Sequence, residues 1–362
     1  MDSALSPLPL QVDLETSAVL KKLSSAHRFL AELKGIAETI PNDVILINTL
    51  ALQEAKDSSE IENIITTHDE LYKEELFSAA IKNPASKEVS RYVQAIKKGF
   101  VLIKEQNQLT TEDILEIHKE LEEDSEGFRR RPGTALKNQT TGMIVYTPPQ
   151  EYDKITELMS NLEKYIIDDS LSNVDPLIKM AIIHHRFESI HPFYDGNGRV
   201  GRIINILYLI TKGLQKLPIL YLSRYIIRNK MRYYSLLQEV RKNNSWEEWI
   251  LFMLDGVEQT SKQTIWIIKR IKELMTFCRQ RLQVEHRKIY SHELLTNLFS
   301  HPYTKIELIQ NDLKVSRITA MKYLNELSES GIVEKHKVGK YNYYINSPLY
   351  DLFINIPDEP EL

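Results

Sequence analysis

The sequence predicts a mostly α-helical protein with one short β-hairpin near its middle and a mixed module at its C-terminal end. Apolar residues recur at helical spacing through most of the chain, whereas strand-like patterns stand out in two stretches, 140–146 and 332–345. The chain has 362 residues, of which 42% are hydrophobic and 27% are charged. This length and composition suit two or three domains. We therefore expect three regions, 1–108, 109–284 and 285–362.

Composition narrows the class of protein. The formal net charge of −4 excludes a uniformly basic nucleic-acid binder, so any such role must be local. Cys278 is the single cysteine, which excludes an internal disulfide and a cysteine-rich metal site. The first ten residues lack the basic and apolar segments of a signal peptide, and no apolar run reaches the ~20 residues of a membrane span. The sequence thus predicts a cytoplasmic protein.

Helices are predicted in order from caps and apolar spacing. Before the hairpin they lie at residues 17–38, 43–56, 86–103 and 110–121. Asn42 and Thr110 are the caps that open the second and the fourth of these. After the hairpin, a helix that begins at Asp175 and Pro176 is apolar nearly all round and should be central. A long helix is expected at about 247–283 as a connector.

Two adjacent histidines, His184 and His185, lie on the predicted central helix. Neighbouring helical residues point in different directions, and the spacing of a zinc-binding HExxH motif is absent. A zinc site is therefore disfavoured. We expect both side chains to be structural and bonded to neighbouring groups.

The most specific stretch is 191–202, where a histidine and an acid run into a glycine-rich turn and then a helix that ends near Gly213. Arg199 and Arg202 are three residues apart, so both project from one face of its first turn. Cations are disfavoured at a helix N-terminus unless an anion binds there. The two arginines therefore indicate an anion site.

The remaining residues of this stretch refine the ligand. Gly196 and Gly198 allow the backbone amides to approach a bound anion closely, as in a di- or triphosphate cradle. Asp195 supplies an oxygen ligand for a phosphate-bound Mg²⁺. His191 is a candidate base toward an incoming hydroxyl, because the ordinary pKa of imidazole lies close to neutral pH.

This stretch resembles the signature HxFx(D/E)GNGRxxR of the Fic family. The matching residues are His191, Phe193, Asp195, Gly196, Asn197, Gly198, Arg199 and Arg202. The resemblance implies adenylylation, in which a Tyr, Thr or Ser hydroxyl attacks the α-phosphate of ATP and pyrophosphate leaves. It implies that His191 accepts the hydroxyl proton and Asp195 holds Mg²⁺. The amides of residues 196–198 would cradle the phosphates, and both arginines would neutralise the leaving pyrophosphate.

A second resemblance concerns the end of the second predicted helix. Ser58 and Glu62 are one helical turn apart and share a face. Taken alone, they suggest a solvated acidic helix end. Together with Asn63 they resemble the inhibitory motif (S/T)xxxE(G/N) of self-regulated Fic proteins. The resemblance implies that Glu62 reaches Arg202 and occupies the place of the ATP γ-phosphate, as a carboxylate can opposite an arginine.

The family resemblance also implies a flap and a nucleotide pocket. The hairpin would be the flap beside the active site, and its edge would hold a target segment as an added strand. The flap residues are Thr141, Gly142, Met143 and Ile144. The base and ribose pocket would come from the helices after the signature, where Tyr233 and Arg241 are the residues carried over. Aromatic residues at such spacing are also typical of a core.

Residues 286–345 contain nine Lys and Arg against six acids, a basic surplus in an acidic chain. Predicted helices at 291–300, 304–311 and 316–330 precede a hairpin around Gly339. This order resembles a winged helix-turn-helix. Its recognition helix would carry Ser316, Arg317, Thr319 and Lys322, and its wing Lys337 and Lys340. Such modules also dock proteins or form dimers, and the modest charge leaves both roles open.

The sequence therefore predicts a protein adenylyltransferase that modifies a target protein and itself and is autoinhibited by Glu62. Two alternatives stay open, a DNA-binding regulator whose Fic domain senses nucleotide and a Fic enzyme that acts mainly in de-AMPylation. His191 separates a sensor from a transferase, because a sensor needs no base. The expected ligands and partners are ATP, Mg²⁺, a hydroxyl-bearing target protein, DNA or protein at the C-terminal module, and a second copy in a homodimer.

Overall fold

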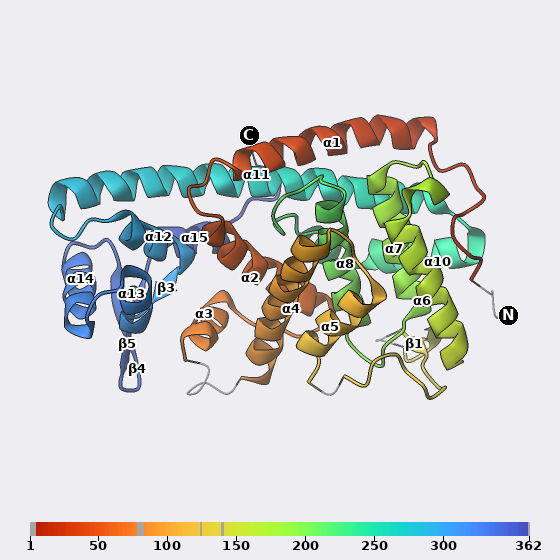
Figure 1. The fold of residues 1–362 in the computed structure, drawn as a ribbon, viewed down its shortest axis with the longest axis horizontal. Coiled ribbons are helices and arrows are strands. Elements are labelled where there is room, and N and C mark those ends of the chain that lie inside the picture. The colour runs from red at the N-terminus through yellow and green to blue at the C-terminus, as the bar shows by residue number, and fades with distance from the viewer. Residues whose placement is uncertain (1–4, 78–82, 124, 139–140, 361–362) are drawn as a thin grey trace. The chain divides into compact units, whose positions relative to one another are not determined.

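The computed structural model describes residues 5–77, 83–123, 125–138 and 141–360, and it is mostly helical (Figure 1). The helices up to the signature are α1 Ser17–Ala37, α2 Asp43–Ile61, α3 His68–Phe77, α4 Pro84–Gln106, α5 Thr111–Leu121, α6 Tyr152–Ile167 and α7 Pro176–Ile190. Those that follow are α8 Asn197–Thr211, α9 Ser223–Arg228, α10 Lys230–Asn243, α11 Trp246–Glu285, α12 His292–Ser300, α13 Ile306–Leu313, α14 Arg317–Glu329 and α15 Ser347–Ile354. Every helix within the described residues is too short or too polar to cross a bilayer.

The chain folds into two compact units that are not continuous in sequence. The first comprises Met1–Ala31, Asp57–Ile64 and Arg91–Thr260, and the second comprises the remaining stretches. In the first unit, α7 lies against both α6 and α8, and every residue of α7 after Pro176 is buried (Figure 1). The expectation of a central apolar helix is confirmed. This packing fixes the ends of α7 and α8, between which the signature loop runs.

The predicted caps explain where two of these helices begin. The Thr110 hydroxyl accepts from the Asp113 amide at 3.2 Å, and the Asp113 carboxylate accepts from the Thr110 amide at 2.8 Å, a complete capping box for α5. Asp175 caps α7 by accepting from the amide of Leu177 at 2.8 Å.

The second helix runs farther than its sequence predicts, to Ile61 instead of about residue 56. Polar residues at 57–60 suggested an earlier end, but Ser58 and Ser59 are fully buried. Burial against the first unit's core therefore outweighs the weak helix preference of serine. As a result, Ser58 belongs to α2, and Glu62 follows directly in the turn.

The predicted hairpin is present, although its first strand lies earlier than expected. Strand β1 is Leu136–Lys137 and strand β2 is Ile144–Tyr146, paired antiparallel with an irregular register. Thr140, where the predicted strand-like stretch begins, lies outside the described residues.

The C-terminal part of the second unit contains the three predicted helices and the hairpin in the predicted order, and in addition a short strand and a final helix, α15. Strand β3 (Tyr303–Thr304) lies between α12 and α13, and β4 (Glu334–Val338) and β5 (Tyr341–Ile345) follow α14. The three strands form an antiparallel sheet in the order β3-β5-β4. Helix α13 packs against α12 and α14. Lys314, with φ of 55°, makes the tight turn between α13 and α14.

Candidate active site

The signature loop connects two tightly packed helices. His191 ends α7 in the left-handed region, with φ of 49°, and Gly196 precedes α8 with φ of 75°. The Asn197 side chain closes the loop, because its amide accepts from the Phe193 N–H and donates to the Phe193 carbonyl, both at 2.9 Å. A non-glycine residue in the left-handed region is strained and persists only where the surroundings hold it. Here the helix packing and the asparagine clamp do so.

The imidazole of His191 is neutral at physiological pH. Burial lowers its pKa to about 4, and the positive charges of Arg129 and Arg241 act in the same direction. A backbone interaction with Glu188 and the charge of Asp195 oppose this shift without cancelling it. A neutral imidazole has a free lone pair and can accept a proton.

Two side chains outside the signature hold the His191 loop. Arg129 is fully buried; its Nε donates to the His191 carbonyl at 2.8 Å, and its Nη2 donates to the carbonyl of Pro149. His118 stacks on Phe193 with ring centroids 3.7 Å apart, and its Nε2 lies 3.1 Å from the carbonyl of Asp195. Neither role could be predicted from the sequence, because Arg129 stands in an arginine run and His118 in an ordinary amphipathic helix.

Asp195 faces outward from the loop. Its side chain is 85% exposed, its Oδ1 accepts from the amide of Gly196 at 2.7 Å, and it lies 3.9 Å from Nη2 of Arg199. The Gly196 amide is therefore occupied by this carboxylate in the structure. The carboxylate remains open to solvent and to a ligand.

Each signature arginine is buried and meets a carboxylate. Nη2 of Arg199 donates to Oε1 of Glu122 at 2.7 Å, and Nη2 of Arg202 donates to Oε1 of Glu62 at 2.9 Å. Both arginines are 2% exposed. These carboxylates supply the negative charge that two cations at the start of α8 require.

Arg202 is also tied to the end of α2. Its Nε donates to the Ser58 hydroxyl at 2.7 Å and its Nη2 to the Ser58 carbonyl at 3.0 Å. Burial by itself would lower the pKa of Arg202, but Glu62, together with smaller contributions from Tyr92, Tyr233 and Glu188, outweighs burial and the pKa is raised. Ser58 and Glu62 therefore both bind the guanidinium of Arg202.

Glu62 covers the glycine turn as well as the arginine. A side chain at Gly198 would collide with Oε1 of Glu62 and would lie 3.0 Å from Nη1 of Arg202. Asn63, next in sequence, has φ of 65°, and its Oδ1 accepts from Nζ of Lys230 at 3.1 Å. Of the predicted inhibitory motif, Ser58 and Glu62 thus contact Arg202 of α8, whereas Asn63 contacts the first residue of α10.

The predicted flap residues lie at the exposed tip and second strand of the hairpin. Met143 is 70% exposed and Ile144 is 61% exposed. The tip is held by Asn138, whose carbonyl accepts from Gly142 at 2.8 Å and whose side chain accepts from Thr141 at 2.9 Å.

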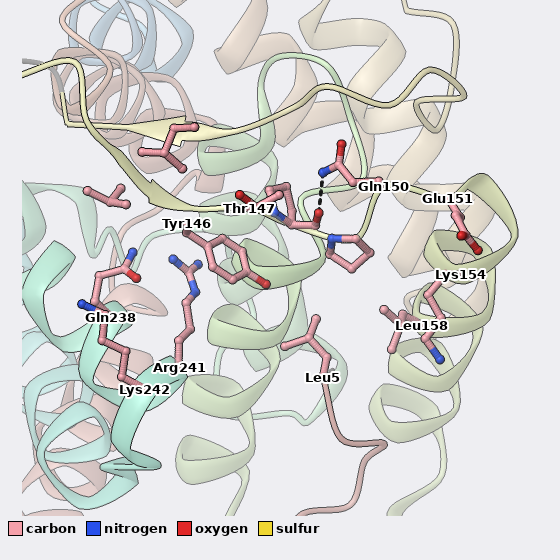
Figure 2. A pocket seen from close by; sticks show the side chains of 14 residues that line it. Leu5, Tyr146, Thr147, Gln150, Glu151, Lys154, Leu158, Gln238, Arg241 and Lys242 are labelled. Atoms are coloured by element: carbon pink, nitrogen blue, oxygen red, sulfur yellow. Dashed lines mark hydrogen bonds between the residues drawn. The ribbon is translucent and has the colours of Figure 1, made fainter. Parts of the chain in front are cut away.

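A pocket of about 560 Å³ lies between the hairpin, α6 and α10 (Figure 2). Strand β2 and residues 147–150 form one wall, and Arg241 and Gln238 of α10 form another. Tyr233 lines no part of it: it is 1% exposed, and its hydroxyl lies 2.8 Å from Nε2 of His184 in the core.

The two adjacent histidines are bonded to neighbours, as predicted. Besides Tyr233, His184 meets the carbonyl of Gly201 at 3.3 Å, and His185 meets the carbonyl of Leu237 at 3.2 Å. Burial lowers the pKa of His184 to about 3, so it is neutral.

Comparison with known proteins identifies the signature region. Residues 108–209 match the Fic/DOC family, and residues 20–101 match the N-terminal region of that family. Residues 108–209, which contain the signature, are thus similar to a Fic domain. Residues 274–349 match the C-terminal domain described for the SoFic-like protein adenylyltransferases.

Two relatives of this chain are named as protein adenylyltransferases. The protein adenylyltransferase fic-1 of Caenorhabditis briggsae is 32% identical over 116 residues, which are 31% of this chain and 22% of that protein. A probable protein adenylyltransferase of Aquifex aeolicus is 27% identical over 201 residues, 54% of this chain and 57% of that protein. The matches thus span less than two thirds of either relative's length.

Solved structures share the fold. A Fic family protein from Desulfovibrio desulfuricans superimposes with a TM-score of 0.61 at 18% identity, covering 94% of this chain and 98% of that one. Fic-1 of Caenorhabditis elegans superimposes with a TM-score of 0.52 at 19% identity, covering 69% and 73%. At these identities the likeness concerns the Fic fold alone.

Proposed function

We propose that this protein transfers AMP from ATP to a Tyr, Thr or Ser hydroxyl of a target protein and to itself. The observation that carries the proposal is the start of α8, where a neutral histidine, an exposed carboxylate and two buried arginines surround a glycine turn. Names of the relatives of the Fic domain support the same reaction.

In the proposed reaction, the acceptor oxygen forms a bond to the α-phosphorus while the bond from that phosphorus to the bridging oxygen of the β-phosphate breaks. The hydroxyl proton passes to the imidazole of His191, and pyrophosphate leaves with the bonding electrons. Arg199 and Arg202 stabilise the charge on pyrophosphate, and the amides of Asn197 and Gly198 contribute at the helix N-terminus.

Asp195 is the residue that we expect to hold Mg²⁺. The described residues contain no group of three or more His, Cys, Asp or Glu side chains suited to a metal built from protein ligands alone. One exposed carboxylate nevertheless fits Mg²⁺, which takes most of its ligands from nucleotide phosphates and water. Bound there, the ion would neutralise phosphate charge.

The nucleotide contacts proposed for Tyr233 and Arg241 rest on family resemblance alone. The hydroxyl of Tyr233 is engaged in the core and the donors of Arg241 are engaged by protein groups. These two residues stay predictions from family resemblance.

We further propose that Glu62 inhibits the enzyme by occupying the γ-phosphate position. Its carboxylate binds Arg202 and covers Gly198, the two groups that the phosphate would use. Transfer then requires Glu62 to leave, while Ser58 keeps hold of Arg202.

The reaction is tested by incubating the purified protein with Mg²⁺ and either α-labelled or γ-labelled ATP. Adenylylation places α-label, and no γ-label, on protein. Label from γ-labelled ATP would indicate phosphorylation, and absence of any label in both wild type and Glu62→Gly would refute the transferase proposal.

For the C-terminal module we propose a winged helix-turn-helix that contacts a partner through α14 and the β4-β5 hairpin. Arg317 is 63% exposed but pairs with Glu307 at 2.7 Å, and Ile318 beside it is 75% exposed. The positive charge of Arg317 is neutralised by Glu307, and Ile318 offers an apolar surface. Both features favour a protein partner, either the target or a second copy, over DNA. Steeply salt-dependent DNA binding that Lys322→Ala weakens would decide for DNA instead.

A further inference from the structure

Arg241 of α10 is bound to the last turn of α7, directly before His191. Its Nε donates to the Ser189 hydroxyl at 2.9 Å, and its Nη2 donates to the Glu188 carbonyl at 3.2 Å. These groups lie two and three residues before the candidate base. Arg241 thus binds one backbone carbonyl and one side chain in the helical turn that precedes His191.

The same guanidinium is bound to the flap. Figure 2 shows it beside the ring of Tyr146 in strand β2. The guanidinium carbon lies 4.0 Å from the ring centroid. The Tyr146 hydroxyl in turn donates to the Ser189 carbonyl at 2.9 Å. Strand β2 and the end of α7 are therefore joined twice, once through the tyrosine hydroxyl and once through the arginine.

Gln238 completes the arrangement one turn earlier on α10. With its amide oxygen toward Arg241, it accepts from Nη1 at 2.8 Å and donates to the Val145 carbonyl at 3.2 Å. All three nitrogens of the guanidinium then have partners within the protein. This explains why the arginine is better suited to fix protein groups than to bind a nucleotide.

We propose that Arg241 and Tyr146 are positioning residues for His191, which fasten the turn before the base to the flap strand that receives the target. The inference rests on the proposed transfer reaction. The base must lie within hydrogen-bond reach of the acceptor hydroxyl, and a misplacement of 1 Å can lower a rate about a hundredfold. Because one arginine touches both elements, base and flap keep a fixed separation.

The charge of Arg241 gives a second readout that a purely structural residue would lack. The charged groups that face His191 are Arg129 from the loop after α5, Arg241 from α10 and Asp195 from the signature loop. Burial and the two arginines lower the pKa of His191, and Asp195 raises it. Removing the charge of Arg241 should therefore raise the pKa of His191 toward its ordinary value.

The test compares Arg241→Gln, Arg241→Lys and Tyr146→Phe with Lys242→Gln, a matched control. Lys242 is exposed and lines the same pocket. In the Glu62→Gly background, we expect Arg241→Gln to lower kcat at least tenfold while KM for ATP changes less than threefold, and to move the acid limb of the pH profile upward. Arg241→Lys should lower kcat but leave the acid limb of the pH profile where it is, because the positive charge is kept. Tyr146→Phe should lower kcat about fivefold to tenfold. The control should match its parent.

NMR titration of histidine-labelled protein, with the His191 signal assigned from His191→Ala, measures its pKa without any reaction. A higher pKa in Arg241→Gln than in wild type is expected whether or not transfer occurs. An unchanged pKa together with an unchanged kcat would overturn the proposal. If label transfer is absent from wild type and every variant, the transferase proposal fails. If the pKa of His191 is then also unchanged in Arg241→Gln, the positioning proposal fails as well.

Discussion

Replacing Glu62 with glycine most directly tests the proposal that its contact with Arg202 is inhibitory. The change removes the carboxylate that lies 2.9 Å from Nη2 of Arg202 and covers Gly198. Arg202 keeps both hydrogen bonds to Ser58, so its position is retained. A hydrogen bond to a charged group contributes about 1.5–3 kcal/mol. Because the Glu62 side chain is 32% exposed, we expect a loss near the lower end of that range.

We expect Glu62→Gly to raise the rate of self-modification although it lowers the free energy of unfolding. In the proposed mechanism, Glu62 keeps the γ-phosphate from Arg202, and the α-phosphate is then held out of line with the acceptor hydroxyl. A misalignment near 1 Å corresponds to about a hundredfold in rate, so Glu62→Gly should raise the initial rate of self-modification by about that factor. Glu62→Gln should activate less, because the amide keeps the shape but loses the charge.

The assay is incorporation of α-label from ATP into purified protein at fixed Mg²⁺, with ATP affinity measured separately by calorimetry. Arg202→Ala in the same background is the control and should erase the gain, since it removes the phosphate ligand. A Glu62→Gly protein that binds Mg²⁺-ATP normally and stays as slow as wild type would refute the reasoning, because Glu62 would then bind Arg202 without competing with the γ-phosphate.

Three further predictions concern single side chains. His191→Ala should abolish transfer while folding and ATP binding are kept, because it removes a proton acceptor and no phosphate ligand; label incorporation equal to the parent would exclude the base role. Asp195→Ala should weaken Mg²⁺-ATP binding, with partial rescue by excess Mg²⁺ in titration calorimetry, and an unaltered metal dependence would argue against the ligand assignment. Burial, together with the charge of Glu62 and against those of Arg202 and Arg241, raises the pKa of Glu188 from 4.5 to about 7. The contribution of Glu188 to the free energy of unfolding is therefore complete below pH 4.5 and is lost as pH rises to 7, a loss on the order of 3 kcal/mol. Glu188→Gln should not show this loss. If the unfolding free energies of wild type and Glu188→Gln change in parallel from pH 4.5 to 7.5, the prediction is wrong.

The sequence by itself determined the elements that depend on local chemistry. Thr110 and Asp175 are cap residues whose hydrogen bonds are made within three positions of sequence, so the starts of α5 and α7 could be predicted. The helix after the signature was equally predictable, since a glycine turn and an apolar helical pattern are both local. The motif that we propose to be inhibitory could be predicted from its spacing, because residues four apart share a helix face.

Only the tertiary structure decided what depends on burial and on distant partners. Helix α2 continues through its serines because they are buried, which no local preference indicates. Arg129 is a buried clamp on His191 although it stands in a run of arginines, and Glu122 proves to be the partner of Arg199 from 77 residues away. Arg241, a predicted nucleotide contact by family resemblance, binds Ser189 and lies over the ring of Tyr146, which no sequence pattern indicated. A charged side chain has no periodicity that reveals its partner, so its role emerges only when packing brings the two together.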